Sequence, residues 1–252
     1  MVVGDLHIGI ETDFALGGVK VPSGTPAMVG RLKALQARTR SRRLVIAGDL
    51  KHSTKEISPQ ETVEVPRALG EMAQAFEEVI VVPGNHDGRI EDLFPRGEQR
   101  IAVAPAGGFL SRGGLLVVHG HAWPDPRLAR KAKVVAMAHS HTAVALEDPL
   151  GRVSKESCWV RAHVNPEKWL ERMGSKGYPE IVMMPPFNDL CTGVPVNVAG
   201  GLGPLIRDGC VDLERGEVYL LDGVHLGRVR DLALGLEPKK LRALTRGVSE
   251  DL

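Results

Sequence analysis

The sequence has few cysteines and no excess of charge, and each shortage excludes a class of protein. Its 252 residues include only three cysteines, Cys158, Cys191 and Cys210, which lie far apart. An odd number of widely spaced cysteines fits neither a disulfide framework nor a zinc site of the Cys-x-x-Cys type. With 32 basic and 31 acidic residues, the net charge of +1 gives no sign of a strongly cationic nucleic-acid binder, although a local basic face stays open.

Long apolar runs are also absent. No stretch approaches the roughly 20 apolar residues that span a bilayer. The opening residues, MVVGDLHIG, place charged and polar groups where a signal peptide has its apolar core. No repeat, low-complexity tract or Ser/Gly-rich linker marks a domain boundary. We therefore expect a cytoplasmic protein without a membrane segment, folded as one domain over residues 1–252.

Short β-branched runs are what the chain does contain, and each is followed by a polar segment: MVVGDLH, RLVIAGD, VIVVPGNHD, LLVVHGH and KVVAMAHSH. Such runs predict strands of a sheet that is covered on both faces. Helical segments lie between the first three, with Thr25 as N-cap before Pro26, and with the capping box Ser58-x-x-Glu61 before a start or kink at Pro66. This alternation indicates an α/β fold, whose ligands gather at the carboxyl ends of the parallel strands.

The remainder of the chain predicts more strands. Two strands around a turn at residues 148–151 are predicted by the segment VALEDPLGRVSKESCWVRAHV. Further strands are indicated by PEIVMMPPF and GEVYLLDG. A short helix is expected after Asn165, which would cap it. A second sheet packed on the first is the simplest use of these strands.

Aspartate, asparagine and histidine side chains that could bind metal ions or transfer protons concentrate in the polar segments after the predicted strands. They are Asp5-x-His7, Gly48-Asp49-x-x-His52, Gly84-Asn85-His86-Asp87, His119-Gly120-His121 and His139-Ser140-His141. Any one of them alone is more often a surface turn, but five at predicted strand ends are hard to attribute to chance. Carboxylate, amide and imidazole ligands suit Mn²⁺, Fe²⁺, Zn²⁺ or Co²⁺ rather than a thiolate zinc site. A pair of ions needs a bridging group, and Asp49 at a central strand end is the candidate.

The order of these motifs resembles the calcineurin-like metallophosphoesterases. DLHIGIE, GDLKH, VPGNHDGRIE, HGHAWPDP, MPPFNDL and EVYLLDGVHLG resemble the archaeal SbcD-related branch of that family. The resemblance implies a four-layer sandwich of two facing mixed β-sheets flanked by helices. It also implies two divalent ions, Mn²⁺ first, with Fe²⁺, Zn²⁺, Co²⁺ or Mg²⁺ as alternatives. One ion would take Asp5, His7, Asp49 and His141, and the other would take Asp49, Asn85, His119 and His139.

The same resemblance implies the reaction. A hydroxide shared by the ions would attack phosphorus in line, without a covalent phosphoenzyme. His86 would stabilise the transition state or protonate the leaving oxygen, Asp87 would orient the His86 ring, and His52 would contact substrate phosphate.

The favoured substrate is a phosphodiester, in nucleic acid or a nucleotide, because the branch resembles nucleases and His52 completes the G-D-x-x-H form. The alternatives are a phosphomonoesterase and a metal-bound nucleic-acid-repair scaffold without turnover. A metallo-β-lactamase-type hydrolase lacks its H-x-H-x-D-H sequence here. A helicase or ATPase partner is an analogy with the branch.

Several residues allow two interpretations. We expect His121 to contact substrate rather than to be an extra ligand. His163 and His225 are expected to be structural or solvent-facing. Asn188, Asp189 and Asn197 could line the far side of a cleft or belong to turns. The run RTRSRR at residues 38–43 could hold a nucleic-acid backbone but fits a solvated helix end better. Trp123, Trp159 and Trp169 are too scattered to predict a base-stacking platform.

Two local features depart from the family pattern. Ala138 stands where the last motif of the family usually begins with glycine, which matters if that turn needs a positive φ. Asp5 lies four residues after Met1, so we expect a short first strand.

Overall fold

A computed structural model describes residues 1–234 of the chain. It separates into two compact units: unit 1 comprises Met1–Ala106 and Phe187–Leu190, and unit 2 comprises residues 107–186 and 191–234. The predicted domain range, 1–252, extends beyond the described residues and stays a prediction. Each unit contains one β-sheet with helices, so the α/β class and the two helix-flanked sheets are confirmed. Among residues 1–234, no helix combines the length and the apolar character needed to cross a bilayer.

Unit 1 is built on a parallel sheet of four strands in the order β1-β2-β3-β4. The strands are β1 (Val2–Val3), β2 (Arg43–Ala47), β3 (Glu78–Val82) and β4 (Ile101–Val103), and the helices are α1 (Glu11–Leu16), α2 (Thr25–Thr39), α3 (Pro59–Ala75) and the short 3₁₀ helix η1 (Ile90–Leu93). The first strand is short, as predicted, and Val2 and Val3 pair with Val45 and Ile46 of β2. Because the strands are parallel, the segments that follow β1, β2 and β3 all leave the same edge of the sheet.

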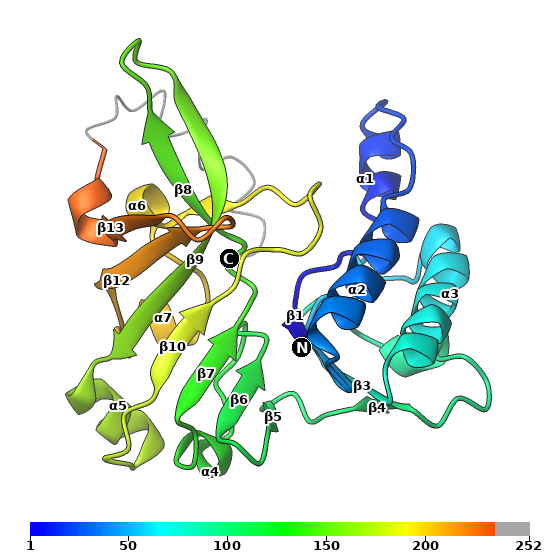
Figure 1. Ribbon diagram of the computed structural model, residues 1–252, viewed down its shortest axis with the longest axis horizontal. Coiled ribbons are helices and arrows are strands. Elements are labelled where there is room, and N and C mark those ends of the chain that lie inside the picture. The colour runs from blue at the N-terminus through cyan, green and yellow to red at the C-terminus, as the bar shows by residue number, and fades with distance from the viewer. Residues whose placement is uncertain (235–252) are drawn as a thin grey trace. The chain divides into compact units, whose positions relative to one another are not determined.

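The helices of unit 1 follow the sequence signals, with two differences. The capping box of α3 is present, since the Ser58 side chain accepts from the Glu61 backbone N–H and the Glu61 carboxylate accepts from the Ser58 N–H. Of the two alternatives at Pro66, the helix start is wrong and the kink stays a prediction: α3 continues through the proline, because buried Val65 and Leu69 hold both sides of it against the core. In Figure 1, α3 lies beside α2.

The predicted N-cap of α2 is also wrong by one residue. Gly24 is the N-cap, and α2 begins at Thr25, whose hydroxyl donates a hydrogen bond to Glu64 Oε2 over 2.5 Å. The local pattern predicted that the Thr25 side chain caps α2. This side chain instead bonds to Glu64 of the neighbouring helix α3.

The run RTRSRR ends α2 and enters β2. Arg40 is the left-handed C-cap of α2. Arg42 and Arg43 form ion pairs of 2.6 and 2.5 Å with Glu77 and Glu78, at the start of the neighbouring strand. These pairs support the interpretation of a solvated helix end.

Unit 2 contains a mixed sheet of nine strands. Seven lie in the order β11-β8-β9-β10-β7-β6-β5, and β12 pairs with both β9 and β13. The strands are β5 (Phe109–Leu110), β6 (Leu115–Val118), β7 (Val134–Met137), β8 (Thr142–Glu147), β9 (Val153–Val164), β10 (Glu180–Met183), β11 (Val194–Pro195), β12 (Val211–Leu220) and β13 (His225–Arg228). The helices are α4 (Pro126–Ala129), α5 (Pro166–Met173), α6 (Val196–Ala199), α7 (Pro204–Arg207) and the 3₁₀ helix η2 (Val229–Leu232).

The local predictions for unit 2 are confirmed. The turn at residues 148–151 joins β8 to β9, and the side chain of Asn165 caps α5 by accepting from the N–H groups of Glu167 and Lys168. β6, β7 and β10 run parallel to one another, so the segments after β6 and β7 leave the same edge of this sheet. The core of unit 2 lies on the side of the sheet that faces Trp169 of α5 and Leu205 of α7.

Candidate functional site

The predicted residues of unit 1 follow three adjacent parallel strands. Asp5 and His7 come after β1, Asp49 and His52 after β2, and Asn85, His86 and Asp87 after β3. The chain therefore brings seven of the predicted side chains to one edge of one sheet. Asp5, His7, Asp49, His86 and Asp87 are buried there, which is costly for such groups unless partners compensate for the lost water.

The backbone at the predicted ligands adopts the left-handed region. In residues 1–234, seven non-glycine residues have positive φ, and five of them are predicted metal ligands: Asp5 (55°), His7 (41°), Asp49 (52°), His139 (66°) and His141 (42°). The other two are Arg40 and Arg89, each beside a helix end. This conformation costs a non-glycine residue about 1–2 kcal/mol. Such strain concentrates at functional sites, where it aims side chains that an extended strand would direct elsewhere.

Asp49 lies at the centre of the unit 1 cluster. Its Oδ1 accepts from the backbone N–H of His86 at 3.0 Å, and its Oδ2 lies 3.6 Å from His7 Nε2 and 4.0 Å from His86 Nε2. Gly84 allows this approach, because a Cβ atom built there would lie 2.1 Å from Asp49 Oδ1. The glycine of the Gly84-Asn85-His86-Asp87 motif is thus required by the aspartate of the preceding motif.

His86 is held in one tautomer. Its Nδ1 contacts the backbone carbonyl of His52. A carbonyl oxygen only accepts, so Nδ1 carries the proton, and Nε2 is the atom that can gain or release one. Nε2 is also the atom that faces the carboxylate of Asp49.

His52 links His7 to a residue that the motifs do not include. His52 Nδ1 lies 3.1 Å from His7 Nδ1, and His52 Nε2 lies 2.9 Å from the carboxylate of Asp13 in α1. His7, His52 and His86 each offer a ring nitrogen, and these atoms lie within 4.8 Å of one another. Nitrogen donors at this spacing, beside buried carboxylates, fit a borderline divalent cation such as Mn²⁺, Fe²⁺ or Zn²⁺.

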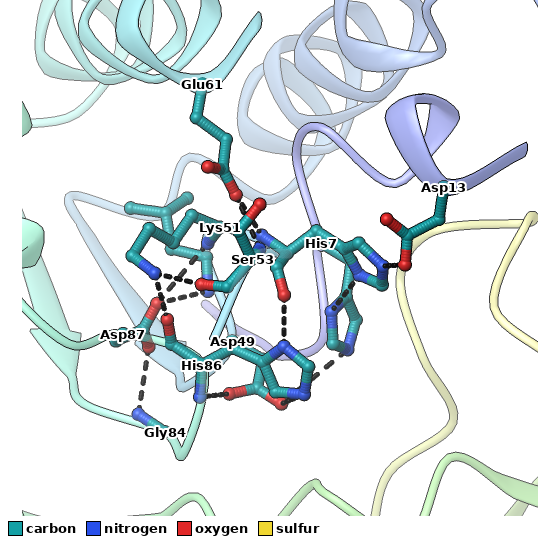
Figure 2. Close-up of polar contacts among 11 residues, drawn as sticks. His7, Asp13, Asp49, Lys51, Ser53, Glu61, Gly84, His86 and Asp87 are labelled. Carbon is teal, nitrogen blue, oxygen red and sulfur yellow. Dashed lines mark hydrogen bonds and ion pairs between the residues drawn. The ribbon is translucent and has the colours of Figure 1, made fainter. Parts of the chain in front are cut away.

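Two buried charged residues that the sequence did not assign to the site support the loops. Lys51 is 1% exposed, and its ammonium group donates to the carbonyl oxygens of His86 and Ser53 (Figure 2). Glu61 accepts through Oε1 from the N–H groups of His52 at 2.9 Å and Ser53 at 2.6 Å. The capping box of α3 is the sequence signal for Glu61, and nothing in the sequence marks Lys51 as buried.

Asp87 holds two loops together through backbone groups. Its Oδ1 accepts from the N–H groups of Leu50 at 2.9 Å and Lys51 at 3.3 Å, and its Oδ2 accepts from Gly84 N–H at 2.8 Å. These bonds join the segments after β2 and β3. The predicted action of Asp87 on the His86 ring stays a prediction.

Asn188 supports the first loop. It lies in the segment of unit 1 that returns late in the chain, where its Nδ2 donates to the Leu6 carbonyl over 2.8 Å and its backbone N–H donates to the Asp5 carbonyl over 3.3 Å. Asp189 pairs with Arg31. Asn197 belongs to unit 2, where its amide bonds to the backbone of Ala145 and Leu232. The structure thus uses Asn188 and Asn197 to fix backbone.

Unit 2 contributes its own histidine cluster. His119 and His121 follow β6, and His139 and His141 follow β7. The ring centroid of His119 lies 5.2 Å from that of His121 and 5.0 Å from that of His139, and the His121 and His139 centroids are 6.2 Å apart. Three of the four predicted histidines therefore converge within this unit, and His121 stands beside the other two rather than apart from them.

Hydrogen bonds between Ser140 and Leu202 fix the turn that carries His139 and His141. Buried Ser140 donates through its hydroxyl to the Leu202 carbonyl over 3.3 Å and accepts from the Leu202 N–H at 3.0 Å. Ala138 is fully buried and is not among the residues with positive φ, which fall on His139 and His141 instead. The methyl group in place of the usual glycine is therefore compatible with this turn.

The chain is similar to a known protein family and to solved structures. The sequence model of a family described as calcineurin-like phosphoesterase matches residues 1–182. No curated protein matches the chain. Among solved structures, the Pseudomonas putida nuclease MPE is 20% identical, with a TM-score of 0.49 and coverage of 87% of this chain and 82% of that chain. The phosphoesterase YfcE of E. coli is 23% identical, with a TM-score of 0.36 and coverage of 59% and 72% respectively.

Proposed function

Since the chain belongs to the calcineurin-like phosphoesterase family, which it matches over residues 1–182, we propose that it hydrolyses phosphodiesters with the help of two divalent metal ions. The substrate class would be nucleic acid or a nucleotide. Family membership makes the protein a metallophosphoesterase, and the proposal adds the type of ester and the number of ions. The SbcD-related branch, the resident Mn²⁺ and a helicase or ATPase partner are further parts of the proposal, supported by the motifs. The proposed cytoplasmic location is supported by the composition, above all by the three widely spaced cysteines.

The observation that carries the proposal is the left-handed backbone at five predicted ligands, drawn from both units. A chain without a use for these side chains would gain stability by placing glycine or asparagine at such positions. Strained aspartates and histidines are retained where a ligand offsets their cost.

We assign the ligands as the motifs imply. Asp5, His7, Asp49 and His141 would hold one ion, and Asp49, Asn85, His119 and His139 the other. When bound, such a pair of ions would lower the pKa of a water molecule and would neutralise the phosphoryl oxygens. The donor set is made of oxygen and nitrogen atoms, which agrees with this use.

The remaining residues would act on the substrate directly or by positioning. His86 would protonate the leaving oxygen from Nε2, because its Nδ1–H is committed to the His52 carbonyl. His52 and His121 would contact the phosphate or its substituents. Asp87, Lys51 and Glu61 would act as positioning residues that keep the loops after β2 and β3 in place.

The ester preference is tested with two chromogenic substrates. We expect the Mn²⁺-loaded protein to hydrolyse bis-p-nitrophenyl phosphate faster than p-nitrophenyl phosphate, and His86→Gln to lose most of this activity. The reverse preference would favour the phosphomonoesterase. A protein that binds two ions and is inert toward both esters would favour the repair scaffold.

A further inference from the structure

A basic hollow lies in unit 2. It has a volume of about 320 Å³, and side chains of β9, β10, β12, β13 and η2 line it: Arg161, His163, Glu180, Arg215, Glu217, Arg228 and Arg230. Four arginines and two glutamates line it, and Asp212 and Asp231 lie beside Arg215 and Arg230. Several guanidinium groups in one concave surface offer hydrogen-bond donors to an anion.

Strand register places these side chains on one face of the sheet. Glu217 of β12 pairs with Arg228 of β13 on one side and with Arg161 of β9 on the other. Directly paired residues of antiparallel strands share a face, so the three side chains form a row. Their neighbours in sequence, Val160 and Val218, point the other way into the core. Figure 1 shows β9, β10, β12 and β13 as adjacent strands of this sheet.

The arginines differ in how firmly they are engaged. Arg161 is fixed by Glu180, with Nε and Oε1 2.5 Å apart. Arg215 and Arg230 have longer contacts of 3.7 and 3.6 Å with Asp212 and Asp231, and both arginine side chains are exposed. Exposed pairs of this kind contribute little and exchange easily for another anion.

Arg228 forms no ion pair within residues 1–234. Its guanidinium group is therefore available to a ligand, together with those of Arg215 and Arg230. Planar guanidinium groups match the oxygens of a phosphate in two-point contacts.

Aromatic rings continue the same face. Tyr219 lies two residues after Glu217, is paired with Trp159 of β9, and stacks on His225 with ring centroids 4.7 Å apart. Trp159 is 36% exposed. The three tryptophans are scattered in the sequence, but the sheet places Trp159 beside Tyr219, whose ring stacks on His225. Arginines next to exposed aromatic rings are the combination that binds unpaired nucleotides, because the rings stack on bases while the cations contact phosphates.

The face also leads toward the edge that carries the predicted ligands. β10 runs parallel to β7, and Met183 at its end is level with Met137, just before His139. On antiparallel β9, His163 is paired with Glu180 at the start of β10, and Val160 with Met183 at its end. The basic hollow therefore lies toward the start of β10, and Trp159 lies toward the end at which the histidine-bearing segments begin.

We propose that this arginine–aromatic face, defined as Trp159, Arg161, Arg215, Tyr219, His225 and Arg228, binds the backbone and bases of a single-stranded nucleic acid. The assignment rests on the proposed phosphodiesterase function and narrows its substrate class. None of the predicted metal ligands belongs to this face, so the hydrolysis of a small phosphate ester does not need it.

Fluorescence anisotropy with a fluorescein-labelled 20-nucleotide DNA strand tests the assignment, in a His86→Gln background that leaves the strand intact. Arg215→Ala with Arg228→Ala should weaken binding about tenfold or more and make the log–log salt dependence shallower by about 1.4, as two lost phosphate contacts require. Trp159→Ala should weaken binding about fivefold or more through lost stacking. The matched control, Arg42→Ala with Arg152→Ala, removes two exposed, carboxylate-paired arginines elsewhere and should stay within twofold.

Two further measurements separate this assignment from the proposed function. In the parent background, Arg215→Ala with Arg228→Ala should hydrolyse bis-p-nitrophenyl phosphate at the parental rate, and the parent's failure on that ester would refute the phosphodiesterase itself. The assignment of the arginine–aromatic face would be overturned if Arg215→Ala with Arg228→Ala bound the DNA strand as tightly as the control, Arg42→Ala with Arg152→Ala. It would also be overturned if the His86→Gln protein without further changes bound no DNA. A duplex that binds as tightly as the single strand would overturn the single-strand assignment.

Discussion

Replacement of Asp87 by asparagine should destabilise the protein strongly although the two side chains have the same shape. The Asp87 carboxylate accepts from three backbone N–H groups, those of Leu50, Lys51 and Gly84. Asparagine keeps one oxygen, which can serve Leu50 and Lys51, but it turns an N–H group toward the Gly84 N–H. One hydrogen bond to a charged acceptor is lost, at about 1.5–3 kcal/mol, and the two that remain become neutral and weaker.

The expected loss is therefore about 3 kcal/mol in the free energy of unfolding. For a chain of this size it corresponds to a fall of roughly 6–12 °C in Tm. Urea and thermal unfolding followed by circular dichroism measure it directly. The matched control is Asp92→Asn, because Asp92 is half exposed and pairs only across the surface, with Arg89 at 2.7 Å.

The control should change stability by less than about 0.5 kcal/mol. If Asp87→Asn also stays within that range of the parent protein, Asp87 does not hold the loops as argued. A large loss in both variants would show that charge alone, rather than the three backbone contacts, explains the effect.

Three further predictions concern a buried lysine, a glycine with positive φ and the cysteines. Lys51→Met should lower stability by about 2–4 kcal/mol, because the buried carbonyl of His86 and the part-buried carbonyl of Ser53 lose their donor. It should also lower kcat more than it changes KM, whereas Lys55→Met, at an exposed position, should do neither. Gly9→Ala should lower Tm, because Gly9 has a φ of +100° and a Cβ there would lie 2.7 Å from Glu61 Cγ; Gly30→Ala, in open space on α2, should not. Thiol titration at pH 8 should detect at most one of the three cysteines, since burial raises the pKa of Cys158 to about 12 and that of Cys210 to about 11; reaction of either buried thiol in the native protein would contradict this.

The sequence predicted the features that depend on local pattern. Apolar runs located the strands that carry the site, and Ser58-x-x-Glu61 and Asn165 located helix starts, because capping joins residues two or three positions apart. The strand ends in turn predicted which aspartates and histidines would gather at one edge of each sheet.

Features that depend on contacts between distant residues escaped prediction. Lys51 is a buried cation because carbonyl groups of two loops surround it, and the sequence shows only a lysine between Asp49 and His52. Thr25 lost its capping role to a bond with Glu64 on the next helix. The row from Arg228 to Arg161 depends on strand register over more than 60 residues of sequence.

The most direct test of the account measures bound Mn²⁺ and bis-p-nitrophenyl phosphate hydrolysis on the same samples of the parent protein, Asp49→Asn and His86→Gln. The account predicts two ions and activity in the parent, loss of both metal and activity in Asp49→Asn, and loss of activity with metal retained in His86→Gln. An Asp49→Asn protein that keeps two ions and parental activity would contradict the central role of Asp49, and an inactive parent with two bound ions would contradict the proposed phosphodiesterase.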